Sequence, residues 1–198
     1  MKITAIKAQV KNPERVSIYV DEKYAFSLNH AQLLEQKLRS GLELTDAQLA
    51  ELKHVSEQGK AYERALNYVM IRPRSLREIQ QYARRKKWAP EDTQVIIDKL
   101  TARNYLNDAS FAKAWVESRK LTKNYSTRKL RLELKQKGIT DDIISEVLAE
   151  DQYDEQSALK ALVAKKLKLS RYANDPQKLM QYLARNGFSY DDIKSAMD

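Results

Sequence analysis

Three stretches of this sequence align without gaps: SLREIQQYARRKKW at 75–88, STRKLRLELKQKGI at 126–139 and DPQKLMQYLARNGF at 175–188. Each begins with a Ser or Asp, residue types that cap helix N-termini. Each then places apolar residues four positions apart, as Leu130 and Leu134 are, which puts them on one helix face. A glycine closes the second and third copies, where Lys87 stands in the first. The sequence therefore predicts the same short helix three times.

The segments around each copy predict two further helices. A large apolar residue follows every copy, and then an acidic pair that suits the positive end of a helix dipole: Glu91-Asp92, Asp141-Asp142 and Asp191-Asp192. An apolar stripe such as Phe111, Ala112 and Val116 precedes the copy and predicts a leading helix. We therefore expect three tandem three-helix units, at 58–108, 109–150 and 151–198, stacked into an elongated array.

The first 57 residues have a different pattern. Residues 1–28 alternate like three short strands, and we expect one face of these strands to carry the following residues: Ile6, Ala8, Val10, Val16, Ile18, Val20, Tyr24, Phe26 and Leu28. A covering helix should begin at Asn29, carry Leu33, Leu34 and Leu38 on one stripe, and end at Gly41. Another helix begins at Thr45, and Gly59 either ends or weakens it. The fold class is mainly α, with a small N-terminal β-rich segment.

Composition excludes several classes of protein. The 198 residues include no cysteine, so disulfide scaffolds and thiolate chemistry are excluded. No apolar run is long enough to span a membrane, and the N-terminus lacks the pattern of a signal peptide, so we expect a cytoplasmic location. Glycine-rich phosphate loops are absent, and His30 and His54 have no partner at metal-ligand spacing. Neither a metal nor a cofactor is expected.

The positive charge is concentrated in the middle of the chain. Residues 58–138 hold 20 Lys and Arg against 8 Asp and Glu, whereas residues 1–57 are neutral and residues 139–198 carry a net charge of −3. A basic block of this kind favours a polyanion or an acidic protein surface as partner, with nucleic acid first.

Two clusters supply the candidate binding residues. They comprise Arg72, Arg74, Arg77, Arg84, Arg85, Lys86 and Lys87, and then Arg119, Lys120, Lys123, Arg128, Lys129, Arg131 and Lys135. Acids other than Glu78 and Glu133 are nearly absent from these clusters, so pairing within a helix cannot neutralise them. The other interpretation, a solvated helix face, explains most charge runs, but here we favour a continuous basic binding surface.

Aromatic residues lie among these cations. Trp88, Phe111 and Trp115 occupy apolar stripes, so we expect them in the core, whereas Tyr125 stands in a turn and is the candidate for stacking on single-stranded bases. The helices that follow each acidic pair are neutral to acidic, which argues against duplex recognition through the major groove.

The recurrent acids Asp92, Asp142 and Asp192 are explained by helix starts. Asp92 or Asp142 with a divalent metal would make a nuclease, but the sequence offers little support for that enzyme class. We expect a protein without catalytic activity.

Several motifs together resemble the RecX family of bacterial recombinase regulators. They are Ala65-Leu66, Arg72-Pro73-Arg74-Ser75, Asn104-Tyr105-Leu106-Asn107-Asp108, Ser118-Arg119 and Lys137-Gly138-Ile139. The similarity is clear over residues 61–148 and looser to residue 198. Two departures are Lys87 in place of the family's glycine, and the end of the sequence after the third unit, where longer members carry a fourth.

The resemblance implies tandem three-helix repeats that bind the RecA–single-stranded-DNA filament and restrain its ATP hydrolysis, strand exchange and coprotease activity. On this basis Arg72, Arg74, Arg77, Arg119 and Arg128 would face the filament. Separately, we expect a monomer. The competing hypothesis is a stand-alone, non-sequence-specific DNA-binding repeat protein that acts on single-stranded or duplex DNA.

Overall fold

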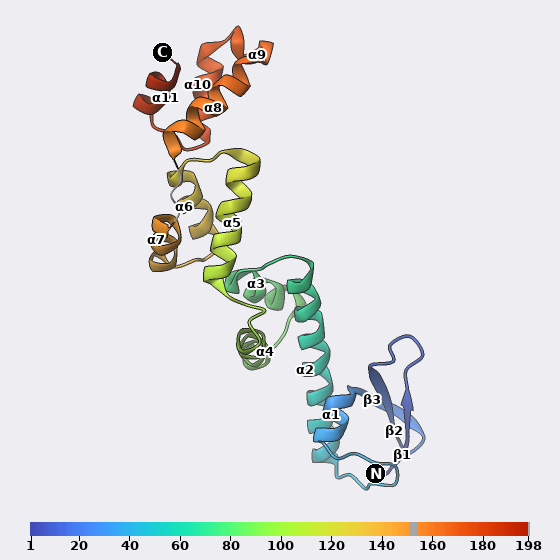
Figure 1. Ribbon diagram of the computed structural model, residues 1–198. Coiled ribbons are helices and arrows are strands. Elements are labelled where there is room, and N and C mark those ends of the chain that lie inside the picture. The colour runs from blue at the N-terminus through green and yellow to red at the C-terminus, as the bar shows by residue number, and fades with distance from the viewer. Residues whose placement is uncertain (151–153, 198) are drawn as a thin grey trace. The chain divides into compact units, whose positions relative to one another are not determined.

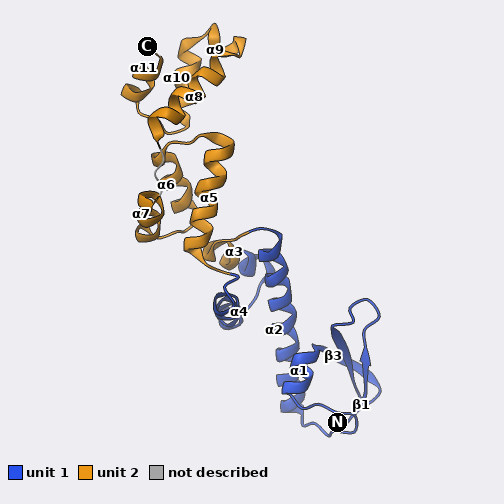
Figure 2. Cartoon of the chain, viewed as in Figure 1, with its two compact units in different colours: residues 1–72, 82–105 blue, residues 73–81, 106–198 orange. Residues whose placement is uncertain are grey.

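The computed structural model describes residues 1–150 and 154–197. The chain forms two compact units, residues 1–72 with 82–105 and residues 73–81 with 106–198, coloured separately in Figure 2. The division falls within the helix at Leu76–Lys86. In the described residues, no helix combines the length and apolar character that crossing a bilayer requires.

An antiparallel sheet forms the N-terminal part of the first unit (Figure 1). Its strands are β1 (Ile3–Ala8), β2 (Arg15–Val20) and β3 (Lys23–Asn29), hydrogen-bonded in the order β1-β2-β3. The face predicted from alternation is confirmed for β2, where Val16, Ile18 and Val20 are all buried. These side chains form one core with Phe26 and Leu28 of β3 and with Leu52 of the following long helix.

Three positions of the predicted sheet face are wrong: Ala8 at the end of β1, Val10 beyond it, and Tyr24, where the pairing is irregular. Strand β1 ends at Ala8, so Val10 is fully exposed. The register shifts between Ile3 and Ala5, which puts Ile3 opposite Val20 and buries it despite its odd spacing from Ile6. A second shift beside Tyr19 turns Tyr24 away from Phe26 and leaves it 54% exposed.

The covering helix α1 (His30–Glu35) is shorter than predicted. Asn29 caps it as expected, within a capping box that it forms with Gln32. The helix ends at a left-handed Lys37, with φ of +50°, instead of at Gly41, which lies in a later turn. Leu33 and Leu38 contact the core, whereas Leu34, which also lies within α1, is exposed, so the prediction that all three share one inner stripe is wrong for Leu34.

Helix α2 (Asp46–Ile71) is continuous through Gly59, so residue 58, where the first three-helix unit was expected to begin, lies inside a helix. Thr45 caps α2 as predicted. A methyl group at Gly59 would lie 2.3 Å from the Gln32 side-chain amide, which also donates a hydrogen bond to the carbonyl oxygen of Val55. Gly59 therefore allows α1 to approach α2 closely.

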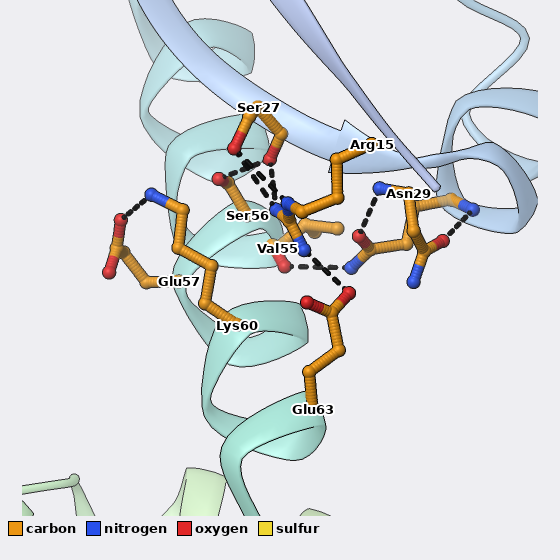
Figure 3. Close-up of polar contacts among 9 residues, drawn as sticks. Arg15, Ser27, Asn29, Val55, Ser56, Glu57, Lys60 and Glu63 are labelled. Atoms are coloured by element: carbon orange, nitrogen blue, oxygen red, sulfur yellow. Dashed lines mark hydrogen bonds and ion pairs between the residues drawn. The ribbon is translucent and has the colours of Figure 1, made fainter. Parts of the chain in front are cut away.

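A buried arginine joins the sheet to α2 (Figure 3). Arg15 is 4% exposed, donates from Nη2 to the carbonyl oxygen of Ser27 at 2.7 Å, and pairs through Nη1 with the Glu63 carboxylate at 2.6 Å. Ser56 of α2 donates to the same Ser27 carbonyl at 2.6 Å. A buried charge needs such partners, because desolvation without them is costly.

Removing the counter-charge should destabilise this unit. We expect Glu63→Ala to lower its free energy of unfolding by about 2 kcal/mol, since the Arg15 guanidinium would stay buried without a carboxylate. The control is Glu57→Ala, which breaks the exposed pair with Lys60 and should cost less than about 0.5 kcal/mol. Urea unfolding followed by circular dichroism measures both, and equal effects would contradict the structural role of Arg15.

The remaining helices form tandem three-helix domains. The first domain uses the C-terminal half of α2, then α3 (Leu76–Lys86) and α4 (Pro90–Ala102). The second domain contains α5 (Asp108–Lys123), α6 (Thr127–Gln136) and α7 (Asp141–Glu150). The third domain contains α8 (Glu155–Leu167), a short α9 (Ser170–Ala173), α10 (Pro176–Arg185) and α11 (Tyr190–Met197). The predicted fold class is therefore confirmed. The expected start of the last unit at residue 151 lies outside the described residues.

The second and third domains each have their own core. Phe111, Leu130, Leu134 and Ile144 are buried in the second domain. In the third domain the core holds Leu179, Leu183 and Ile193, which correspond to Leu130, Leu134 and Ile144, together with Leu159, Tyr172 and Phe188. The apolar residues four positions apart in the second and third repeated segments thus lie on the helix face that is turned toward the core, as their spacing predicts.

Candidate nucleic-acid and protein interface

The second unit contains a joint between the N-terminus of α3 and the second three-helix domain. The Leu76 backbone N–H donates to Oδ1 of Asp108, the first residue of α5, at 2.8 Å. Ser75 donates from Oγ to the Lys137 carbonyl oxygen at 2.7 Å, at the turn that ends α6. Both bonds use positions that a helix leaves unsatisfied at its ends.

The same joint recurs one repeat later. The Thr127 backbone N–H donates to Oε2 of Glu155, the first residue of α8, at 2.9 Å. The Ser126 backbone N–H donates to the Asn186 carbonyl oxygen at 3.1 Å, at the turn that ends α10. The domains of this unit are therefore connected by a repeated set of contacts between equivalent positions.

The joints explain where the repeat requires glycine. Gly138 has φ of +83°, and a methyl group there would lie 2.7 Å from the Arg77 side chain. Gly187 has φ of +95°, and a methyl group there would lie 2.3 Å from Oγ of Ser126. Lys87 also has positive φ, +57°, but its turn closes the first domain, which docks onto no earlier three-helix domain. Left-handed backbone strains a lysine without forbidding it, so only a close contact makes glycine obligatory.

The third domain lacks the donors that start a joint. Pro176 occupies the position of Leu76 and Thr127, and proline has no backbone N–H. Asp175 replaces Ser75 and Ser126, and its own N–H already bonds to the Tyr172 carbonyl oxygen. The N-terminus of α10 therefore cannot repeat the contacts that α3 and α6 make.

The carboxyl group of Asp108, which accepts the hydrogen bond from Leu76 at the first joint, is partly buried. Burial raises the pKa of its carboxyl group, while the hydrogen bond from Leu76 opposes that shift. A raised pKa means that the folded state binds the proton more tightly, so this group favours folding more as the pH falls through the raised pKa. The ionised form of the Asp108 carboxyl is correspondingly disfavoured in the folded state.

We expect Asp108→Asn to keep the acceptor for the Leu76 N–H and leave stability at pH 7 unchanged or slightly higher. Asp108→Ala removes the acceptor and should cost about 1 kcal/mol. Urea unfolding at pH 7 and pH 4.5 measures the free energy of unfolding of both variants. Lowering the pH should raise the stability of the wild type relative to that of Asp108→Asn. If Asp108→Asn lost as much stability as Asp108→Ala, the role of Asp108 as an acceptor for the Leu76 N–H would be wrong.

The first predicted basic cluster is divided between the units. Arg72, at the end of α2, belongs to the first unit together with Arg84, Arg85, Lys86 and Lys87 at the C-terminus of α3. All five are exposed. Arg74 and Arg77 belong to the second unit, where the Arg77 side-chain stem covers Gly138. The predicted continuous surface across this cluster thus stays a prediction.

The second cluster lies within one unit, and ion pairs occupy part of it. Arg119 of α5 pairs with Glu133 of α6 at 2.8 Å, and Lys135 pairs with Asp141 of α7 at 2.8 Å. Arg131 approaches the same Asp141 at 3.9 Å. The sequence argument excluded pairing within a helix, but these three cations find their acids on neighbouring helices, which that argument did not consider.

Two other members of this cluster lie near the end of α5. Lys123 is exposed in the last turn of the helix. Lys120 is half-buried, and desolvation lowers its pKa while the charge of Glu117 opposes the shift. Neither side chain lines the hollow between Arg128 and Arg185.

A hollow of about 420 Å³ lies between α6 and α10, and we call it the basic hollow. Its lining residues come from both helices and the turn after α10: Arg128, Lys129, Arg131, Leu132, Lys135, Ala184, Arg185 and Gly187. Five of the eight are cations. The structure thus brings four of the predicted residues to one place, since the second joint holds α10 against α6.

Sequence reasoning missed Arg185. It stands alone in a mildly acidic segment, so no charge cluster marks it. The alignment of the three repeated segments, together with the docking of α10 on α6, is the signal that could have identified it. Among the described residues, Arg128 and Arg185 have no acidic partner.

The aromatic candidates are more buried than a stacking platform requires. Tyr125 is half-buried against the core of the second domain, with the Lys129 ammonium 5.9 Å from its ring centroid. Trp115 is covered by two cations, Arg119 at 4.0 Å and Lys137 at 4.7 Å, and donates from Nε1 to Glu133 at 2.9 Å. Phe111 is buried, as predicted, while Trp88 is half-buried against Tyr82.

The recurrent acids stand in the first turns of α4, α7 and α11, as predicted. Asp92 accepts a hydrogen bond from Gln58 at 2.9 Å and lies 3.2 Å from His54. Asp142 is exposed and belongs to the other unit. Within the ranges 1–150 and 154–197, no three His, Cys, Asp or Glu side chains form a group able to hold a metal ion.

Family models match nearly the whole chain. They describe a regulatory protein RecX N-terminal domain at residues 1–45 and the first, second and third three-helix domains of RecX at residues 61–100, 107–148 and 153–197. These matches and the fold define a class: regulatory proteins built from a small N-terminal sheet domain and tandem three-helix domains.

Individual proteins agree. The regulatory protein RecX of Bacillus subtilis (strain 168) is 36% identical to this chain over 201 residues, and the alignment covers 99% of this chain and 76% of the relative. The regulatory protein RecX of Listeria monocytogenes serovar 1/2a is 33% identical over 202 residues, and the alignment covers 99% of this chain and 74% of the relative. A crystal structure of a regulatory protein RecX superposes with a TM-score of 0.78 at 30% identity over 98% of both chains. RecX from Lactobacillus salivarius gives a TM-score of 0.60 at 28% identity, over 71% of this chain and 94% of that one. The chain belongs to the RecX family of regulatory proteins.

Proposed function

We propose that this protein regulates the recombinase RecA by binding the RecA–single-stranded-DNA filament through the basic residues of its three-helix domains. Bound in this way, it lowers ATP hydrolysis, strand exchange and coprotease activity, and acts in the cytoplasm as a monomer. The observation that carries the proposal is the family match over all four domains, because the relatives bear the name regulatory protein RecX.

The electrostatics of the chain support a filament as partner. The block at 58–138 carries a net charge of +12, and its exposed members include Arg84, Arg85 and Arg128. A nucleoprotein filament presents repeated negative charge, which attracts such a surface at long range and makes binding salt-dependent.

Single-stranded-DNA-dependent ATP hydrolysis by RecA of the same organism, titrated with this protein, tests the proposal. We expect hydrolysis to fall at substoichiometric amounts, because one bound molecule would affect several RecA protomers. Unchanged hydrolysis, together with clear DNA binding in a gel shift, would reject the proposal and favour a stand-alone DNA-binding protein.

A further inference from the structure

The two joints have the same design but different charge. At the first joint, Glu78 of α3 stands where α6 has Lys129, and it pairs with Lys137 at 3.1 Å. Gln80 and Gln136 stand where the second joint has Arg131 and Arg185. Arg77 and Arg84 stand at the positions of Arg128 and Lys135, so the two joints differ in charge at three positions. Since both joints dock domains, the cations Lys129, Arg131 and Arg185 are not a requirement of docking.

Collecting five cations has an electrostatic cost in the free protein. Like charges that share one hollow repel. Of the five, only Lys135 and Arg131 approach an acid that the structure describes, Asp141 at the edge of the hollow. Arg128 and Arg185 lack an acidic partner among the described residues. An anionic ligand would relieve this repulsion, and guanidinium groups bind phosphate oxygens in bidentate fashion.

The turn beside the hollow supplies a further donor. Asn186 precedes Gly187, is 8% exposed, and its Nδ2 amide has no hydrogen-bond partner within the described part of the chain. A buried donor without a partner costs free energy, so a ligand oxygen that reached this turn would satisfy an unmet hydrogen bond.

We propose that the basic hollow binds the sugar–phosphate backbone of single-stranded nucleic acid. An acidic side chain of a protein brings one charge into such a hollow, whereas a nucleic-acid strand brings successive phosphates and can neutralise several cations together. Leu132, 49% exposed on the lining, gives the sugar an apolar surface. This inference deepens the function proposed above, because it assigns direct nucleic-acid contact to one part of the basic surface.

Fluorescence anisotropy with labelled oligo-dT, in the absence of RecA, tests the inference on the full chain. The variant Arg128→Gln/Arg185→Gln removes the two cations that have no acidic partner among residues 1–150 and 154–197, and it leaves the residues of the joint contacts unchanged. We expect oligo-dT affinity to fall at least tenfold, and the slope of log affinity against log salt to become shallower by about 1.4, or 0.7 for each lost phosphate contact.

The matched control is Lys165→Gln/Lys194→Gln, which removes two exposed cations of the third domain that do not line the hollow. It should change affinity less than about twofold. Equal affinities of the two double variants for oligo-dT would overturn the inference.

RecA ATP hydrolysis measured with the same variants separates this inference from the proposed function. Normal oligo-dT binding combined with lost inhibition of RecA would overturn the nucleic-acid assignment, and the hollow would then be a protein contact. Lost oligo-dT binding, with a wild-type protein that never inhibits RecA, would support the hollow as a nucleic-acid site while rejecting the regulatory proposal.

Discussion

Reversing the charge of Arg72, Arg74 and Arg128 together should abolish inhibition of RecA ATP hydrolysis. Each Arg→Glu change replaces attraction to a negative surface by repulsion, and like charges brought together cost several kcal/mol. We expect half-maximal inhibition to need at least about 100-fold more protein, the equivalent of ~3 kcal/mol. The measurement is a titration of RecA and single-stranded DNA at two salt concentrations.

The control for this variant reverses three exposed lysines away from both basic clusters, Lys23, Lys165 and Lys168. It produces the same net charge as the triple arginine variant, so it separates the position of the charges from their sum. Inhibition should stay within about threefold of wild type, because only long-range attraction is weakened. If both variants inhibit equally, the predicted binding surface is in the wrong place.

Gly187→Ala should open the second joint. The methyl group would lie 2.3 Å from Oγ of Ser126 and 3.0 Å from the backbone nitrogen of Lys129, and the φ of +95° is unfavourable for alanine. Left-handed backbone costs about 1–2 kcal/mol, and overpacking adds about 1–3 kcal/mol. The backbone N–H of Ser126, which bonds to the Asn186 carbonyl oxygen, should therefore exchange with solvent about 100-fold faster.

The matched control for this glycine is Lys87→Ala. Lys87 ends the corresponding turn with φ of +57°, but that turn docks onto no earlier three-helix domain. We expect a change in stability below about 0.5 kcal/mol and no change in exchange at Ser126. Protection of Ser126 that survives in Gly187→Ala would show that the joint does not need glycine.

Local signals in the sequence were sufficient for the repeats and most caps. Asn29, Thr45, Ser126 and Asp175 cap helices as predicted. A short polar side chain directly before a helical apolar pattern accepts a hydrogen bond from a backbone N–H of the first turn, and this depends only on nearby residues. The acidic pairs lie in first turns for the equally local reason of the helix dipole.

Features that depend on pairing between distant residues were not predictable. The register shift that buries Ile3 depends on how β1 meets β2, and neither strand encodes it alone. The ion pair of Lys135 with Asp141 arises from the packing of α6 with α7. Likewise, Arg185 joins the basic hollow only because α10 docks on α6.

The joints also determine which domain could be duplicated. The first domain carries only the donor half, Ser75 and Leu76, and the third carries only the acceptor half, Glu155 and the turn at Gly187. The second domain carries both. A tandem copy of residues 107–148 would therefore present matching backbone contacts on each side, so a gene encoding a longer relative could arise by duplication of this domain. Lys129 would then meet the copied Lys137 where Glu78 does in the first joint, and a substitution there would restore the ion pair.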